Sequence, residues 1–291
     1  MFKLIRDKHS ILTLDPKPHK EVIIEHYKNI YYQKESGLYK KEYTEKEVSG
    51  FRNKAKVFLS LYEKYCGSKP SNVFEPGFGE GFTLNYFNDN QIECFGIDLS
   101  QEGLSQHNSK LIGNDNIKQG SFEEGIYFDK KFDLIILDHL LEHVYDIDKT
   151  MENLIEYMKK GSLVIVLVPN EFNLIQNIYL EKNNLKMEDA PWIQEVEHIR
   201  YFQKETLDNL FSNYNFERSS KFMSDFPIDM NILFDDSDYY KNPSMGKNAY
   251  NIKLEFESML INKSVNKYID LCESFADNDI GRNLIAVYHL N

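Results

Sequence analysis

Short runs of apolar residues recur through the middle of the chain, and each is followed by a more polar stretch. The runs predict strands near residues 72–75, 92–97, 132–137 and 162–168, with a weaker one at 116–119. "FDLIIL" and "LVIVLV" are continuously apolar, which is typical of strands buried on both faces. Helical segments separate them, such as "MENLIEYMKKG" at 151–161. Alternating strands and helices predict a doubly wound α/β fold with a mostly parallel sheet.

The two ends of the chain follow other patterns. Residues 1–66 have a helical, tyrosine-rich pattern, and Thr44 and Glu47 have the spacing of a capping box. An apolar helical stripe then runs to Gly67. Residues 1–66 are therefore expected to form an N-terminal helical cap, and 67–291 the main domain. "HIRYFQKETLDNLFSNYNF" predicts a helix and a strand, "NLIAVYHLN" a final strand, and about 226–280 a mostly helical, aromatic-rich insertion over the sheet edge.

Charge and cysteine content exclude several classes of protein. The 291-residue chain has a formal net charge of −12, which argues against nucleic-acid and anionic-membrane partners. Three distant cysteines fit neither a disulfide framework nor a zinc site, and favour a reducing cytoplasm. The start lacks the apolar core of a signal peptide, and no apolar run approaches the roughly 18 residues of a membrane span. A cytoplasmic location is expected.

The stretch "VFEPGFGEGF" places Gly77, Gly79 and Gly81 directly after the first predicted strand of the sheet. In doubly wound sheets, ligands bind outside the carboxyl ends of the strands. A dinucleotide site would have the spacing G-x-G-x-x-G. Here the spacing is G-x-G-x-G, and Glu75 stands two residues before it. We expect the backbone to approach a cofactor so closely that a side chain would collide with it.

Together with "CFGIDLS", "IKQGSFEEG" and "FDLIILDHLLEHVYD", this spacing resembles the class I S-adenosylmethionine-dependent methyltransferases over roughly residues 70–225. The resemblance implies a seven-stranded, Rossmann-like sheet and S-adenosylmethionine as cofactor. It places Asp98 at the ribose hydroxyls and Phe122 at the adenine ring, with Ser121 where an Asp is commonest. Tyrosines of the cap, Tyr31, Tyr32 and Tyr39, would cover the cofactor. The cofactor-binding set is Glu75, Gly77, Gly79, Gly81, Asp98, Ser121, Phe122, Asp138 and Tyr32.

Methylation of an oxygen requires a base, and His is suited to this near neutral pH. His139 follows the fourth strand and His198 precedes a later helix, so the two are equal candidates, with His143 as a third. Glu142 and His143 are expected to begin a helix. Some quinone O-methyltransferases of the family hold a metal with an acid followed by Glu-His, but His139 replaces that acid here, and no metal is predicted. Arg200 and Arg282 could bind a phosphate or carboxylate of the acceptor.

The passage "EHIRYFQKETLDNLF" resembles the branch of the family that acts on small molecules and sugars, and "FPIDM…GK…FE…GRN" resembles a subgroup of surface-polysaccharide methyltransferases. The resemblance implies methyl transfer to a hydroxyl of a small, sugar-like acceptor, nucleotide-linked or phosphorylated, with a homodimer as an option. The alternatives are an N-methyltransferase, a nicotinamide-dependent oxidoreductase, and a non-catalytic binding subunit.

Overall fold

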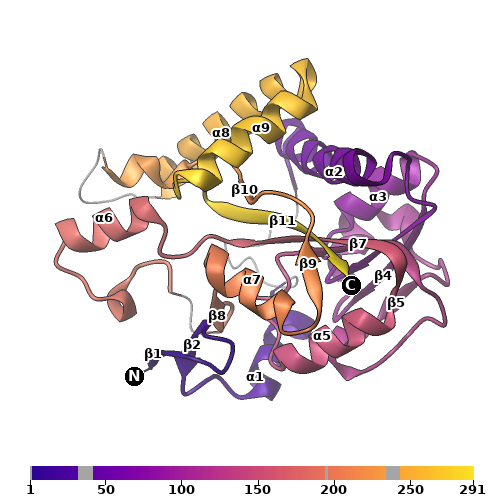
Figure 1. Cartoon of the computed structure of the whole chain (residues 1–291), viewed down its shortest axis with the longest axis horizontal. Coiled ribbons are helices and arrows are strands. Elements are labelled where there is room, and N and C mark those ends of the chain that lie inside the picture. The colour runs from indigo at the N-terminus through magenta and orange to yellow at the C-terminus, as the bar shows by residue number, and fades with distance from the viewer. Residues whose placement is uncertain (1, 32–41, 194–195, 234–242) are drawn as a thin grey trace.

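A central sheet lies between two layers of helices, so the doubly wound α/β prediction is confirmed (Figure 1). The computed structural model describes residues 2–31, 42–193, 196–233 and 243–291. One layer holds α2 (Glu45–Cys66), α3 (Phe82–Asp89), α4 (Glu102–His107), α8 (Pro243–Lys263) and α9 (Val265–Asp277). The other holds α5 (Ile147–Glu156) and α7 (Lys204–Ser212).

The sheet has the strand order β10-β11-β7-β6-β3-β4-β5, with β9 also paired to β11. The five strands from β5 to β7 are parallel, and β11 runs antiparallel to β7. The mostly parallel sheet is therefore confirmed. Its strands are β3 (Asn72–Pro76), β4 (Glu93–Asp98), β5 (Ile117–Gln119), β6 (Phe132–Asp138), β7 (Met158–Pro169), β9 (Phe216–Arg218), β10 (Met223–Ser224) and β11 (Asn283–Leu290).

Eight strands fill seven positions, because β9 and β10 share one side of β11. β10 pairs with Leu284 and Ile285, and β9 pairs with residues 288–290. Between them, the backbone N–H of Ser219 still donates to the carbonyl of Val287 at 2.8 Å. The two strands are thus one interrupted edge strand, which agrees with the seven-stranded expectation.

Alternate residues of the central strands face opposite helix layers. In β6, Leu134 and Ile136 belong to a buried cluster that includes Phe58 of α2. Ile135 and Leu137 belong to a second cluster, which includes Leu154 of α5. Both faces are covered, which explains why these strands have continuous apolar sequences.

The segment after β6 departs from the sequence prediction. The helix predicted at 151–161 ends at Glu156, and Met158 begins β7, because Met158 is buried and pairs with Phe132. The prediction that Glu142 and His143 begin a helix is also wrong. The helix α5 begins at Ile147, where the Asp146 side chain accepts a hydrogen bond from the backbone N–H of Lys149. Glu142 and His143 lie in the turn before it.

The N-terminal segment is only partly helical. Two strands, β1 (Lys3–Arg6) and β2 (Leu12–Asp15), form a small sheet with β8 (Arg200–Tyr201). The helical expectation fails there because β2 buries Leu12 and Leu14 through pairing with a strand about 190 residues away, which local periodicity cannot register. Next come α1 (Lys20–Glu25) and a π-helix, η1 (His26–Ile30).

The helix α2 matches its prediction at both ends. Thr44 and Glu47 form the capping box, and Gly67 ends the helix with a φ of 74°. The remaining short elements are η2 (Ser109–Leu111), η3 (Phe122–Glu124), α6 (Leu174–Lys182), η4 (Met187–Asp189) and η5 (Ile228–Leu233).

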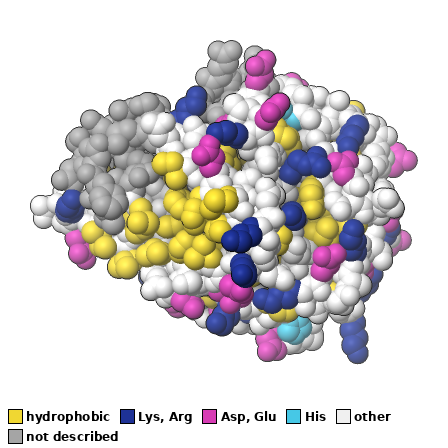
Figure 2. All heavy atoms as spheres, turned by 90° about the horizontal axis from the view of Figure 1, so that it is seen from above, with side chains coloured by type: hydrophobic (Ala, Val, Ile, Leu, Met, Phe, Trp, Pro, Cys, Tyr) yellow, Lys and Arg dark blue, Asp and Glu magenta, His cyan; other side chains and the backbone are white. Residues whose placement is uncertain are grey.

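The surface formed by the upper helix layer mixes both signs of charge (Figure 2). Hydrophobic side chains also gather on this face, beside the grey atoms. Among the described residues, α8 exposes Ile252 and Met259 by 57% and 61%. None of the helices described is long and apolar enough to cross a bilayer.

Candidate functional site

A cavity of about 620 Å³ opens at the carboxyl ends of the parallel strands. This volume fits a cofactor together with a small acceptor. The structure brings most of the predicted site residues to its wall. They are Glu75, Gly77, Gly79, Gly81, Asp98, Ser121, Phe122, Asp138, His139, His143, His198 and Arg282. Tyr31 also lines the cavity, whereas Tyr32 and Tyr39 fall outside the described residues.

The three glycines of the turn all have positive φ, at 74° for Gly77, 53° for Gly79 and 73° for Gly81. Side chains rarely adopt this conformation, which explains the residue type. At Gly81 an added Cβ would lie 2.2 Å from Cδ1 of Leu104, so packing against α4 also excludes a side chain. The expected collision with a cofactor is therefore not the whole reason for these glycines.

Asp98 is the last residue of β4, and its side chain is hydrogen-bonded to the glycine turn that follows β3. Its Oδ2 accepts a hydrogen bond from Gly79 N at 2.9 Å, and its Oδ1 accepts one from Ser100 N at 3.0 Å. Burial raises the pKa of this carboxyl to about 6. Each carboxylate oxygen can accept a second hydrogen bond, so Asp98 remains able to accept from two ribose hydroxyls.

Ser121 and Phe122 lie beyond the end of β5. The Ser121 side chain accepts a hydrogen bond from Glu123 N at 3.3 Å and so caps η3. Phe122 is 5% exposed and packs edge-to-face on Phe74, with ring centroids 5.7 Å apart. This position therefore offers an aromatic wall, whereas the serine hydroxyl is already used by the local turn.

Three ionisable side chains meet at the carboxyl ends of β3 and β6. Lys54 of α2 places its Nζ 2.5 Å from Oδ2 of Asp138. Burial raises the pKa of Glu75 well above its usual value, and the neighbouring Asp138 raises it further. Glu75 Oε2 and Asp138 Oδ1 are buried without a hydrogen-bond partner in the described part of the chain.

Sequence reasoning missed Lys54, although a signal was present. The residue lies three positions after Phe51 and four before Phe58, on the apolar stripe of α2. A lysine on such a face is unusual unless it is paired.

His139 and Glu142 form a hydrogen-bonded pair beside the cavity. His139 Nδ1 lies 2.9 Å from Oε1 of Glu142, which is fully buried. Burial alone would raise the pKa of Glu142, but His143 and His139 more than offset this and lower it to about 2. The ionised carboxylate can only accept, so Nδ1 donates, and Nε2 of His139 is left as an acceptor.

His198 lies beside His143 in the cavity wall. Burial, followed by the proximity of His143, lowers the pKa of His198 to about 3, so its ring is neutral at physiological pH. The rings of His143 and His198 are 4.9 Å apart. His143 Nδ1 lies 2.8 Å from the Tyr27 hydroxyl and 2.5 Å from the Glu197 carbonyl oxygen. His143 is thus held by the N-terminal segment.

Glu142, His143 and His198 have potential metal-ligand atoms within 4.8 Å of one another. Glu142 Oε1, however, already accepts from His139. These side chains do not decide whether a metal binds, and the absence of a metal remains a prediction from the sequence.

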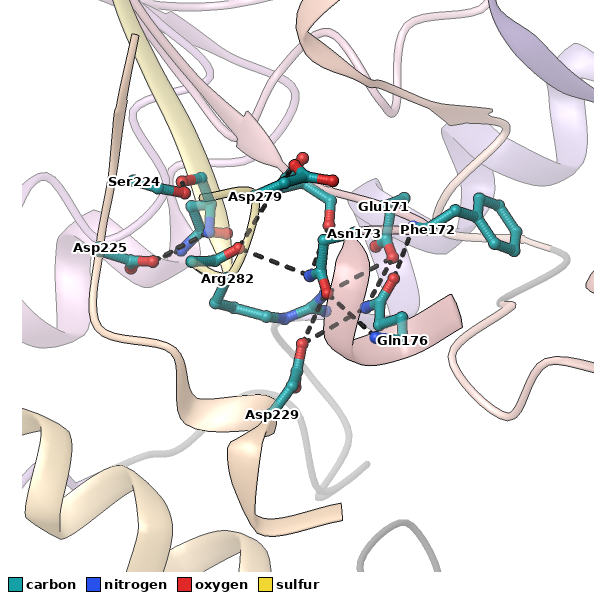
Figure 3. Close-up of polar contacts among 12 residues, drawn as sticks. Glu171, Phe172, Asn173, Gln176, Ser224, Asp225, Asp229, Asp279 and Arg282 are labelled. Carbon is teal, nitrogen blue, oxygen red and sulfur yellow. Dashed lines mark hydrogen bonds and ion pairs between the residues drawn. The ribbon is translucent and has the colours of Figure 1, made fainter. Parts of the chain in front are cut away.

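Arg282 and Lys253 also line the cavity. Figure 3 shows Arg282 directed towards acidic side chains, with Nη1 at 3.5 Å from Glu171 Oε2 and 3.7 Å from Asp229 Oδ2. Lys253 forms an ion pair with Asp225. Sequence reasoning missed Lys253, which lies inside the long insertion, where no motif marks it.

Arg200 is not brought to the cavity lining. Its side chain is 2% exposed, and the guanidinium donates to the carbonyl oxygens of Val144 and Tyr145. The arginine therefore connects β8 to the loop after β6. Its predicted role in acceptor binding gains no support from this position.

Comparisons with known proteins agree with the site. A family model described as a methyltransferase domain matches residues 49–220. Ajmaline N-methyltransferase of Rauvolfia serpentina is 29% identical over 105 residues, which cover 34% of this chain and 36% of that enzyme. The match thus spans about a third of this relative.

Two solved structures share the fold. The plantazolicin methyltransferase BpumL in complex with SAH superposes with a TM-score of 0.54 at 14% identity, covering 94% of this chain and 95% of that one. A SAM-dependent methyltransferase from Archaeoglobus fulgidus gives 0.50 at 18% identity, covering 81% and 93%. At these identities the likeness concerns the fold.

Proposed function

We infer the acceptor from the premise that the chain belongs to the methyltransferase-domain family and uses S-adenosylmethionine as its methyl donor. We propose that the acceptor is a hydroxyl group of a small polar metabolite, a sugar or a sugar nucleotide. Bound S-adenosylmethionine supplies the methyl group. The chain has to align the acceptor with it and remove the hydroxyl proton.

The observation that carries this proposal is the hydrogen bond between His139 and Glu142. A buried, ionised carboxylate that accepts from Nδ1 leaves Nε2 of His139 as a base next to the cavity. An imidazole oriented by a third group is the usual arrangement for removing a hydroxyl proton. His198 is the weaker candidate, because its lowered pKa makes it a poor proton acceptor.

The size and polarity of the cavity support a small acceptor. About 620 Å³ leaves limited room beside a cofactor. We assign to the acceptor the polar residues Tyr250, Lys253, Arg282 and Asn283 of the cavity wall. We propose that Arg282 contacts the acceptor, as predicted from sequence, while Glu171 and Asp229 hold its guanidinium in place.

One observation favours a second candidate, an amine acceptor. The relative from Rauvolfia serpentina is an N-methyltransferase, and a neutral amine needs no base.

A panel assay separates the two candidates. The purified protein is incubated with methyl-labelled S-adenosylmethionine and matched sets of sugar phosphates, sugar nucleotides and amines, and labelled products are identified by mass spectrometry. We expect label on a hydroxyl oxygen of a sugar compound. Label on amines alone would overturn the oxygen proposal, and would leave the methyltransferase assignment standing.

A further inference from the structure

We propose that Lys54 of α2 is a cofactor-binding residue that, with Glu75 and Asp138, recognises the amino-acid end of S-adenosylmethionine. The inference concerns the cofactor and does not depend on the identity of the acceptor. It assigns a function to a side chain of a helix that precedes the first strand of the central sheet.

The position of the three side chains follows from the sheet. Glu75 is the penultimate residue of β3 and Asp138 the last residue of β6, and these strands are parallel neighbours through Val73 and Leu134. The edge runs in the order β5, β4, β3, β6. Phe122 lies beyond β5 and Asp98 ends β4, so an adenosine group held there directs its 5′ substituent towards β3 and β6. The amino-acid end then reaches Lys54.

The charges in this cluster match an amino acid. Burial lowers the pKa of Lys54, but Asp138 more than offsets it and the net shift is upward, so the ammonium is retained. Glu75 and Asp138 each have a buried oxygen without a partner among the described residues. Such atoms are costly unless a donor reaches them. The cofactor offers an ammonium to the two acids and a carboxylate to Lys54.

A second ion-paired lysine, Lys253, shows what a carboxylate satisfied within the fold looks like in this protein. Lys253 pairs with Asp225, whose two oxygens also accept from Asn283, from the backbone N–H at 2.9 Å and from Nδ2 at 2.7 Å. That carboxylate is satisfied within the fold. The Lys54 pair differs because Asp138 Oδ1 has no such donor among the described residues, and because the Lys54 side chain is more exposed than that of Lys253, 31% against 15%.

The test compares two ligands that differ only in the amino-acid end. S-adenosylhomocysteine carries the ammonium and the carboxylate, whereas 5′-methylthioadenosine carries neither. Both are titrated calorimetrically into the wild type and into Lys54→Met and Lys54→Arg. The matched control is Lys64→Met, which removes another ion-paired lysine of α2, the partner of Glu273.

We expect Lys54→Met to weaken S-adenosylhomocysteine binding about tenfold or more, because a charge-assisted contact is lost. Binding of 5′-methylthioadenosine should stay within about twofold, which would also show that the variant is folded. Lys54→Arg should retain part of the affinity, and Lys64→Met should match the wild type.

Equal losses for both ligands in Lys54→Met, or no loss for either, would overturn the role of Lys54. A wild-type protein that binds neither ligand would overturn the cofactor site itself, and the role of Lys54 with it.

Discussion

The two ends of the cavity are built in different ways. The proposed cofactor end is formed mainly by residues 75–138, where the acids Glu75, Asp98 and Asp138 lie at the carboxyl ends of three neighbouring strands. The proposed acceptor end is assembled from segments scattered through the chain. Its lining residues are Tyr27, His139, Leu140, His143, Val144, Tyr145, Glu197, His198, Ile228, Tyr250, Lys253, Arg282 and Asn283.

This difference determines what each end can be inferred from. A glycine turn and an acid one strand later have a fixed separation in sequence, because the parallel sheet brings consecutive strand ends together. No such spacing relates Tyr27 to His143, although the two side chains are in hydrogen-bond contact at 2.8 Å. The cofactor end can thus be recognised locally, whereas the acceptor end requires the fold.

Because the two ends of the cavity are built from different segments, we expect single substitutions to impair one end and spare the other. The largest effect is expected for His139→Asn. We expect turnover of the hydroxyl acceptor to fall about 1,000-fold, because a positioned base is lost. S-adenosylhomocysteine affinity should change by less than about twofold, since the substitution leaves the cofactor end intact. Turnover is measured with the acceptor found in the panel assay.

His198→Asn is the matched control for the base. Because the His198 ring is neutral and a poor proton acceptor, its loss should cost less turnover than the loss of His139. A larger loss in His198→Asn would reassign the base.

Arg200→Met should affect stability and neither end specifically. Removing the guanidinium takes a donor from the buried carbonyl of Val144 and from the partly buried carbonyl of Tyr145. We expect the free energy of unfolding to fall by about 3 kcal/mol, measured by urea denaturation. Near-normal stability combined with a raised KM for the acceptor would show instead that Arg200 contributes to acceptor binding.

Asp98→Ala should break the cofactor end alone. Loss of two hydrogen bonds from ribose hydroxyls to a carboxylate is expected to weaken S-adenosylhomocysteine binding about 30-fold, close to 2 kcal/mol. Calorimetry measures the affinity, and circular dichroism checks that the variant is folded. Undiminished affinity would show that the ribose is held elsewhere.

A smaller effect should appear with pH at the same residue. Burial raises the pKa of Asp98 from 3.8 to about 6, so the carboxylate that accepts from the ribose is lost as pH falls through 6. S-adenosylhomocysteine affinity should drop about fivefold between pH 7.5 and 5.5.

Asp98→Asn is the control for this pH dependence, and its weaker binding should not vary over the same range. The shift also affects folding. The folded state holds the Asp98 proton longer than the unfolded chain, so this group lowers stability as pH rises from about 4 through 6. A wild-type affinity that is constant with pH would contradict the role of Asp98.

The fold could be predicted further than the site. The parallel strands and α2 follow from apolar runs, a capping box and a glycine, which are local signals. The pairing of β2 with β8 could not be predicted, because Leu12 and Tyr201 meet only in the tertiary structure. The early start of β7 was missed because "MENLIEYMKKG" keeps a helical pattern past Glu156.

Within the site, the glycines and Asp98 were found from spacing, and the structure places them together. His139 and His198 could not be separated by sequence, because their difference lies in burial and in the bond to Glu142. Arg200 was assigned from its residue type, and only the structure shows that its guanidinium is used by the carbonyls of Val144 and Tyr145 and is not part of the cavity lining.

The most direct test of the account is a calorimetric titration of the wild-type protein with S-adenosylhomocysteine and, separately, with NAD. The geometry of the glycine turn and Asp98 predicts micromolar binding of S-adenosylhomocysteine and none of NAD. No binding of S-adenosylhomocysteine, or tight binding of NAD, would contradict the assignment of the cofactor end.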